Sequence, residues 1–163
     1  MKPWLPSNLP IGLCFLMIVH SQTPTVIQGH VQRQSESDAL ECLALTLYWE
    51  AGGEPSAGLA AVGWVVLNRQ AHPDFPSTIC QVVREGDNQP GCQFTYSCDG
   101  KSDTPADLKL WSRVRTIAQE VIKQTIPDPT NGALFFHAAN LAEVPWAIPR
   151  ERTAQIGNQI YYR

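Results

Sequence analysis

The sequence lacks a surplus of charge of either sign. Its 12 basic and 15 acidic side chains give a formal net charge of −3 at pH 7, and they are spread along the chain. Nucleic acids and anionic membrane surfaces select proteins with dense clusters of Lys and Arg. The charge pattern therefore argues against both as partners. The length of 163 residues is typical of one domain.

No apolar run approaches the roughly 20 residues needed to span a bilayer. The run IGLCFLMIV, residues 11–19, is much shorter; it follows the basic Lys2 and ends at Val19, which with Ser21 has the spacing of a signal-peptidase site. The pattern predicts a signal peptide over residues 1–21 and an exported protein of the periplasm or cell envelope, with no stable membrane span after cleavage. A retained signal anchor is the alternative interpretation.

Cysteine is scarce, and its spacing is not that of a metal site. Cys14 leaves with the signal peptide; Cys42, Cys80, Cys92 and Cys98 remain, with no C-x-x-C pair among them and no His close to the last two. We therefore expect no metal and no other cofactor. An even number of cysteines in an exported chain predicts two disulfides, with three pairings open. A free thiol acting with a histidine is the alternative, which disulfide formation would remove.

Local patterns divide the rest of the chain. Residues 22–36 are polar and without apolar periodicity, which predicts a flexible leader ahead of a folded domain over residues 37–163. Periodicity and end signals predict helices near residues 38–51, 55–69 and 107–122, and a short helix within residues 74–83. QFTYS is interpreted as one edge of a hairpin, and ALFFHAA and GNQIYYR as short strands or extended segments. The expected fold class is α+β, mainly helical, with a small β-hairpin or extended region and disulfides.

Glu50 stands where a carboxylate is unfavourable. Projected at about 100° per residue, the apolar stripe of its helix centres on Leu40, Leu47 and Ala51, and Glu50 lies at the edge of that stripe. It also lies in the last turn before Gly52, where the helix macrodipole is negative. Partial burial and the dipole both raise the pKa of a carboxyl, which suits a general acid. From helix geometry alone, an outward-turned and solvated Glu50 is the alternative.

Six blocks of the sequence, taken in order, resemble the SleB/CwlJ-type cell-wall hydrolase family. They are ALTLYWEAGGEPSAGLAAVGWVVLNR, FPSTICQVV, CQFTYSCDGKSD, DPTNGALFFHAA, PWA and IGNQIYYR. The resemblance runs from about Ala39 to the C-terminus and implies a lysozyme-like catalytic domain over residues 37–163, related to lytic transglycosylases and acting on the glycan strands of peptidoglycan. It also implies that Glu50, at the end of the first helix, is the catalytic acid.

Four positions depart from the pattern of that family. Gly52 stands where the family usually has Arg, Leu134 and Phe135 replace a polar residue and a His, and Gln159 replaces a His. We expect the fold to tolerate these changes. We expect their effects to fall on activity or on substrate preference.

The reaction type depends on whether a second carboxylate takes part. Hydrolytic glycosidases use two carboxyls, and the candidates for the second are Glu54 and Asp99, then Asp87 and Asp103. We interpret Glu54 as accepting N–H groups at the start of the second helix and Asp99 as a turn residue. This favours a lytic transglycosylase with one catalytic Glu. The alternatives are a hydrolytic muramidase, a catalytically weak peptidoglycan-binding domain, and a wall amidase or peptidase, which would need a metal or a free Cys/His pair.

Further residues are candidates for contacts with the glycan. They are Gln93, Phe94, Tyr96, Tyr48, His137 and Trp146. Packing in the core is the alternative for Phe94 and Trp146, and a structural role is the alternative for His137. Asn68 and Arg69 are expected to close the second helix and anchor a loop. The sequence leaves a regulatory protein partner open.

Overall fold

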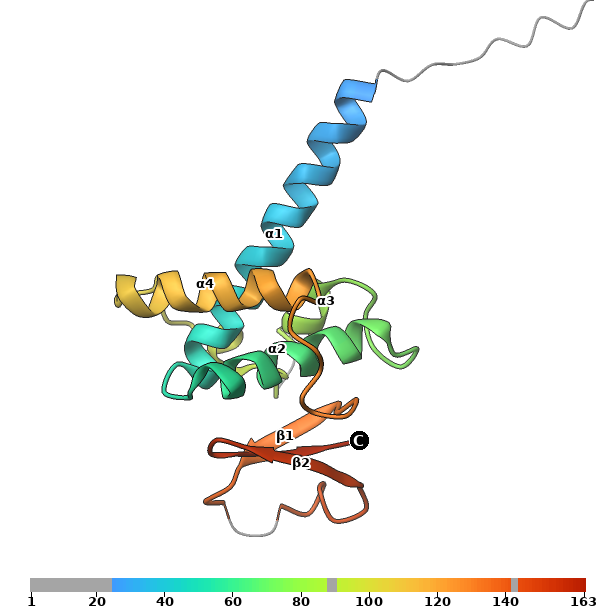
Figure 1. Cartoon of the computed structure of the whole chain (residues 1–163), viewed down its shortest axis with the longest axis vertical. Coiled ribbons are helices and arrows are strands. Elements are labelled where there is room, and N and C mark those ends of the chain that lie inside the picture. The colour runs from blue at the N-terminus through green and yellow to red at the C-terminus, as the bar shows by residue number, and fades with distance from the viewer. Residues whose placement is uncertain (1–24, 88–90, 142–143) are drawn as a thin grey trace, which may run out of the picture.

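The computed structural model describes residues 25–87, 91–141 and 144–163, in which helices form one layer and a small sheet another (Figure 1). The helices are α1 (Thr25–Ala51), α2 (Ser56–Ala71), α3 (Ile79–Val83), the 3₁₀ helix η1 (Thr95–Cys98) and α4 (Leu108–Ile122). The strands are β1 (Phe135–Ala138), β2 (Arg152–Ile156) and β3 (Gln159–Tyr162). The expected mainly helical α+β class is confirmed. The predicted signal peptide, residues 1–21, lies outside the described residues.

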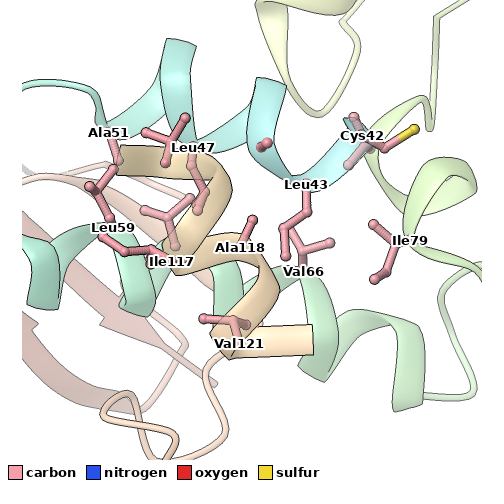
Figure 2. Packing of buried hydrophobic residues seen from close by; sticks show 14 of the residues in the cluster. Cys42, Leu43, Leu47, Ala51, Leu59, Val66, Ile79, Ile117, Ala118 and Val121 are labelled. Atoms are coloured by element: carbon pink, nitrogen blue, oxygen red, sulfur yellow. The ribbon is translucent and has the colours of Figure 1, made fainter. Parts of the chain in front are cut away.

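The core lies where α1, α2 and α4 pack against one another. Buried side chains of α1, α2 and α4 meet there (Figure 2), among them Leu43, Leu47, Leu59, Val66, Ala118 and Val121. Small residues on α2 allow the close approach, since a Cβ on Gly63 would lie 3.3 Å from Val121. At the other end of the core, Asp107 fixes the start of α4 by accepting hydrogen bonds of 2.9 Å from the backbone N–H groups of Lys109 and Leu110.

Helix α1 begins earlier than its sequence pattern indicated. We expected this helix to begin near residue 38, but α1 already begins at Thr25, so that expected start was wrong. The physical reason is that no proline interrupts residues 25–54, and the single Gly29 costs only about 1 kcal/mol in a helix. The start of α1 extends away from the other helices (Figure 1).

The sheet covers one side of α2. Its strand order is β1-β3-β2, with both pairings antiparallel, and Ala61 and Val65 of α2 pack with the buried Ala133 and Tyr161. The expected strands at ALFFHAA and GNQIYYR are confirmed as β1 and β3. β2 was not predicted, because its residues are largely polar and lie at an edge of the sheet.

The segment QFTYS is not a hairpin edge. It turns into η1, with Ser97 N–H donating to Phe94 O at 3.1 Å, because a disulfide between Cys92 and Cys98 closes the segment into a short loop. The hairpin interpretation was therefore wrong.

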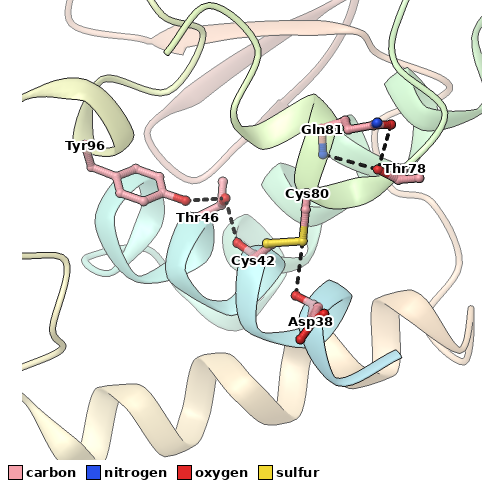
Figure 3. The surroundings of a disulfide bond; sticks show 7 residues. All are labelled: Asp38, Cys42, Thr46, Thr78, Cys80, Gln81 and Tyr96. Carbon is pink, nitrogen blue, oxygen red and sulfur yellow. Dashed lines mark hydrogen bonds between the residues drawn. A yellow bond between two sulfur atoms is a disulfide. The ribbon is translucent and has the colours of Figure 1, made fainter. Parts of the chain in front are cut away.

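Two disulfides form, as the cysteine count predicted. Cys42 of α1 pairs with Cys80 of α3, and Cys92 pairs with Cys98. Beside the first bond, Thr46 Oγ1 donates to Cys42 O and lies 2.9 Å from the Tyr96 hydroxyl, which ties η1 to α1 (Figure 3). Within the described ranges, no helix has both the length and the apolar character required to cross a membrane.

Candidate active site

Glu50 occupies the last turn of α1, half buried at the edge of the core. Its neighbours Leu47 and Ala51 are fully buried on the inner face of the helix, and the helix ends at Ala51. Burial raises the pKa of the Glu50 carboxyl above its usual value, and the negative end of the helix dipole acts in the same direction. The geometry agrees with the interpretation of Glu50 as an acid and not with a fully solvated side chain.

Two hollows meet at Glu50. The first, of about 490 Å³, lies between the end of α1 and the sheet, and its other lining residues are Arg69, Gln93, Phe94, Phe135, Phe136, His137, Ala138, Trp146, Arg150 and Gln159. The second, of about 310 Å³, is lined by Trp49, Glu50, Thr95, Tyr96, Asp99, Lys101, Ser102 and Asp103. Because Glu50 lines both, a polymer lying along them would have one of its bonds beside this carboxyl.

The loop closed by the second disulfide supplies three of the predicted contact residues. Gln93 is exposed and lines the first hollow, as does Phe94, although Phe94 is 1% exposed and also belongs to the core cluster. Tyr96 lines the second hollow. The Cys92–Cys98 bond brackets all three, so it holds one wall of the cleft.

His137 and Trp146 lie together in the first hollow. Their ring centroids are 5.7 Å apart, and Trp146 is 39% exposed, which leaves a ring surface for a sugar. Both nitrogens of His137 are engaged, Nδ1 at 2.9 Å from Ala138 O and Nε2 at 3.0 Å from the Tyr162 hydroxyl. The two hydrogen bonds agree with a structural role for His137, which also lines the first hollow.

Tyr48 has a different position from the other predicted contacts. Its hydroxyl accepts hydrogen bonds from the backbone N–H groups of Ala106 and Asp107, at 3.2 and 3.0 Å, and its ring packs edge-on against Trp111. Tyr48 therefore holds the start of α4 and is not among the residues lining the two hollows.

The two leading candidates for a second carboxylate, Glu54 and Asp99, both have hydrogen-bond partners within the protein. Glu54 Oε2 accepts a 3.0 Å hydrogen bond from Asn158 N–H in the turn between β2 and β3; it does not cap α2, whose N-cap has no side-chain hydrogen bond. Asp99 accepts from Lys101 N–H at 2.9 Å and forms an ion pair with the same residue. This backbone hydrogen bond lowers the pKa of Asp99, as expected of a turn residue.

The remaining two carboxylates have different surroundings. Asp87 accepts a 2.6 Å hydrogen bond from Ser97 Oγ, which ties it to η1. Asp103 is half buried and lines the second hollow together with Glu50. Asp99 lines the same hollow but is paired with Lys101.

Two of the four positions that depart from the family pattern, Phe135 and Gln159, line the cleft, whereas Gly52 and Leu134 do not. A Cβ on Gly52 would lie 2.5 Å from Tyr48 O and 3.0 Å from Leu110 Cδ2, so a larger residue there requires the end of α1 to shift. Phe135 and Gln159 both line the first hollow. Gln159 is 9% exposed, and its Oε1 has no hydrogen-bond partner among the described residues.

Several residues of the cleft were not predicted as site residues, among them Trp49, Arg69 and Arg150. Trp49 is 44% exposed in the second hollow, and its position next to Glu50 in the sequence was the available signal. Arg69 and Arg150 line the first hollow. The sequence did not mark these two, because the Phe135 ring that both of them contact comes from another segment of the chain.

Comparison with known proteins decides the family. A model described as Cell Wall Hydrolase matches residues 53–162. The chain belongs to the cell wall hydrolase family. The matched region begins three residues after Glu50 and does not include it. The argument for the role of Glu50 therefore depends on its geometry.

Relatives of this cell wall hydrolase include two spore cortex-lytic enzymes. That of Bacillus subtilis (strain 168) is 30% identical over 124 residues, which cover 75% of this chain and 36% of the relative. That of Oceanobacillus iheyensis is 31% identical over 132 residues, which cover 80% and 43%. The matched region thus spans less than half the length of either relative.

Solved structures share the fold of the cell wall hydrolase domain. The catalytic domain of the Bacillus cereus SleB protein matches with a TM-score of 0.64 and 28% identity, covering 78% of this chain and 91% of that one. The catalytic domain of the germination-specific lytic transglycosylase SleB from Bacillus anthracis matches with a TM-score of 0.62 and 28% identity, covering 77% and 93%.

The raised pKa of Glu50 predicts how the stability of this cell wall hydrolase depends on pH. At pH values between the pKa of Glu50 in the unfolded chain and its raised pKa in the folded protein, the folded state binds more protons than the unfolded state. The free energy of unfolding therefore falls as the pH rises through this window. Gln cannot ionise, so we expect Glu50→Gln to stabilise the protein relative to wild type more at about pH 8 than at about pH 4. Urea denaturation at both pH values measures this difference.

The matched control is Glu36→Gln, on an exposed residue of the same helix, which removes one negative charge without removing a half-buried carboxyl. A stability gain for Glu50→Gln that is equal at both pH values, or that matches the gain of the control, contradicts the prediction.

Proposed function

We propose that this cell wall hydrolase cleaves the glycan strands of peptidoglycan between N-acetylmuramic acid and N-acetylglucosamine, as a lytic transglycosylase with Glu50 as its one catalytic carboxyl. The observation that carries the proposal is the position of Glu50, half buried and with a raised pKa where two hollows meet. The relatives named as spore cortex-lytic enzymes, and the structural neighbour named as a lytic transglycosylase, support it.

The reaction begins with proton transfer from Glu50. The protonated carboxyl donates to the glycosidic oxygen, the bond from the muramyl C1 to that oxygen breaks, and N-acetylglucosamine leaves with its 4-hydroxyl restored. The resulting carboxylate then takes the proton of the muramyl C6 hydroxyl, whose oxygen bonds to C1 and closes a 1,6-anhydro ring. Glu50 ends protonated and ready for another cycle.

One carboxyl suffices for this sequence because the second nucleophile belongs to the substrate. The C6 hydroxyl is held in the same sugar as C1, so the ring closure needs no activated water. Exposed aromatic side chains on both sides of Glu50, Trp146 in the first hollow and Trp49 in the second, offer surfaces for sugar rings. The described residues contain no group of three metal-ligating side chains, and the proposed steps use none.

Hydrolysis by a muramidase is the second candidate function, because Asp103 shares the second hollow with Glu50. In that reaction Asp103 would activate a water or act as the nucleophile. The two functions differ in their products: a transglycosylase leaves anhydromuramyl ends that borohydride does not reduce, whereas a muramidase leaves reducing muramic ends.

We further infer export to the cell envelope. Two disulfides form and persist in an oxidising compartment, and peptidoglycan lies outside the cytoplasmic membrane. The signal-peptide pattern of residues 1–21 supports the same location.

The test is product analysis. The chain from Gln22 onward is incubated with purified peptidoglycan, and the soluble muropeptides are analysed by mass spectrometry before and after borohydride reduction. We expect non-reducible anhydromuramyl ends with the wild type and not with Glu50→Gln. Reducible ends that disappear in Asp103→Asn establish the muramidase instead, and peptidoglycan binding without any release establishes a binding domain.

A further inference from the structure

Arg150 is a cation fixed in the wall of the first hollow. It comes from the segment between β1 and β2 and lines the same hollow as Glu50. Its guanidinium carbon lies 4.1 Å from the centroid of the Phe135 ring and 5.5 Å from that of Trp146. Its Nη1 also donates a hydrogen bond to Trp146 O. Two ring faces and a carbonyl therefore hold the half-buried guanidinium in place.

Among the residues that the structure describes, no carboxylate forms an ion pair with Arg150. Of the five N–H donors of a guanidinium, the hydrogen bond to Trp146 O uses a single nitrogen. By contrast, Lys101 in the second hollow is already paired with Asp99 at 3.2 Å. Arg150 thus has both charge and donors available to a ligand.

A second arginine adds to the positive character of this wall. Arg69 is 4% exposed, its Nε donates to Leu134 O at 2.7 Å, and its guanidinium carbon lies 5.7 Å from the same Phe135 ring. Burial lowers the pKa of Arg69 to about 10, so it stays protonated at neutral pH, and Glu85 is the acidic group that acts on it. Arg69 is too buried to reach a ligand easily, whereas the half-buried Arg150 is accessible.

We propose that Arg150 binds a carboxylate carried by the lactyl or stem-peptide substituent of the muramyl residue, and so makes the cleft select muramic-acid-containing strands over neutral polymers of N-acetylglucosamine. This inference rests on the proposed function. An arginine presents a planar fork that matches a carboxylate through two parallel N–H···O bonds. Stacking on Phe135 and Trp146 fixes the plane of that fork before the substrate arrives.

Binding is measured in the Glu50→Gln background, so that no ligand is consumed. Isothermal titration compares three tetrasaccharides: one with stem peptides, one stripped to free lactyl carboxylates, and chitotetraose, which carries no carboxylate. We expect Arg150→Gln to weaken binding of the acidic ligands about tenfold, as for loss of a charge-assisted hydrogen bond, and to leave chitotetraose unchanged. A loss of affinity confined to the ligand with stem peptides places the carboxylate in the peptide. A loss confined to the stripped ligand places it in the lactyl group.

Two variants complete the design. Arg150→Lys keeps the charge without the fork and is expected to recover part of the affinity. Arg152→Gln removes an exposed arginine two residues away, whose guanidinium contacts Gln155, and is expected to change nothing. Equal loss for all three ligands means that Arg150 only supports the Trp146 segment, and no loss for any ligand means that it does not bind substrate; either result overturns the inference. Absence of binding by the parent Glu50→Gln protein overturns the proposed function instead.

Discussion

Replacing Glu50 by Gln is expected to slow release of muropeptides from peptidoglycan by about 10³–10⁴-fold, near the upper end for loss of a general acid–base catalyst. The same carboxyl donates a proton in one step and accepts one in the next, so Gln removes both functions. Release is measured as initial rate with purified peptidoglycan, alongside thermal unfolding to show that the variant is folded.

The matched control is Glu54→Gln, four residues along the chain. The amide oxygen that this substitution introduces can still accept the hydrogen bond from Asn158 N–H, so the rate is expected to stay within about threefold of wild type, since surface substitutions that keep their contacts have small effects. A Glu50→Gln protein that retains one-tenth of the wild-type rate would exclude Glu50 as the catalytic acid and direct attention to Asp103.

Replacing Cys42 and Cys80 together by Ser is expected to lower the free energy of unfolding by about 3–4 kcal/mol. The bond joins α1 to α3 across a sequence separation of 38 residues, and the chain-entropy estimate for a loop of that length gives this value. Urea denaturation of the double variant beside wild type measures the change. Cleavage is expected to persist at low temperature, because neither cysteine lines the two hollows at Glu50.

The second disulfide provides the comparison. It closes a separation of only 6 residues, so its removal as Cys92→Ser with Cys98→Ser is expected to cost about 2 kcal/mol. The same change frees the loop that carries Gln93, Phe94 and Tyr96, and the affinity for the glycan should fall. If the two double variants lose equal stability and equal affinity, the assignment of one bond to the scaffold and the other to the cleft is wrong.

Sequence periodicity was sufficient to predict the features that depend on a single helix. The position of Glu50 follows from a rotation of about 100° per residue along α1, and the helix predicted near residues 107–122 is observed as α4. The count of cysteines predicted two disulfides but not their pairing. The pairing of Cys42 with Cys80 required knowledge of how α3 packs against α1.

Features made by distant segments were not accessible in the same way. Arg69 was interpreted as closing α2, yet the folded chain surrounds its guanidinium with Phe75, Phe94 and Phe135, from three separate segments. Glu54 was interpreted as a helix cap, but Asn158, far away in sequence, supplies its partner. The companion residue Asn68 does anchor a loop, since its Nδ2 donates to Asp128 Oδ2 at 3.0 Å.

The length and direction of α1 determine how far Glu50 lies from the beginning of this helix. At a rise of about 1.5 Å per residue, the helix places Glu50 about 38 Å from Thr25, and its first turns project beyond the other helices (Figure 1). The first turn of α1 and the carboxyl of Glu50 therefore stand at opposite ends of a rod. The helix is a spacer between its own beginning and the two hollows that meet at Glu50.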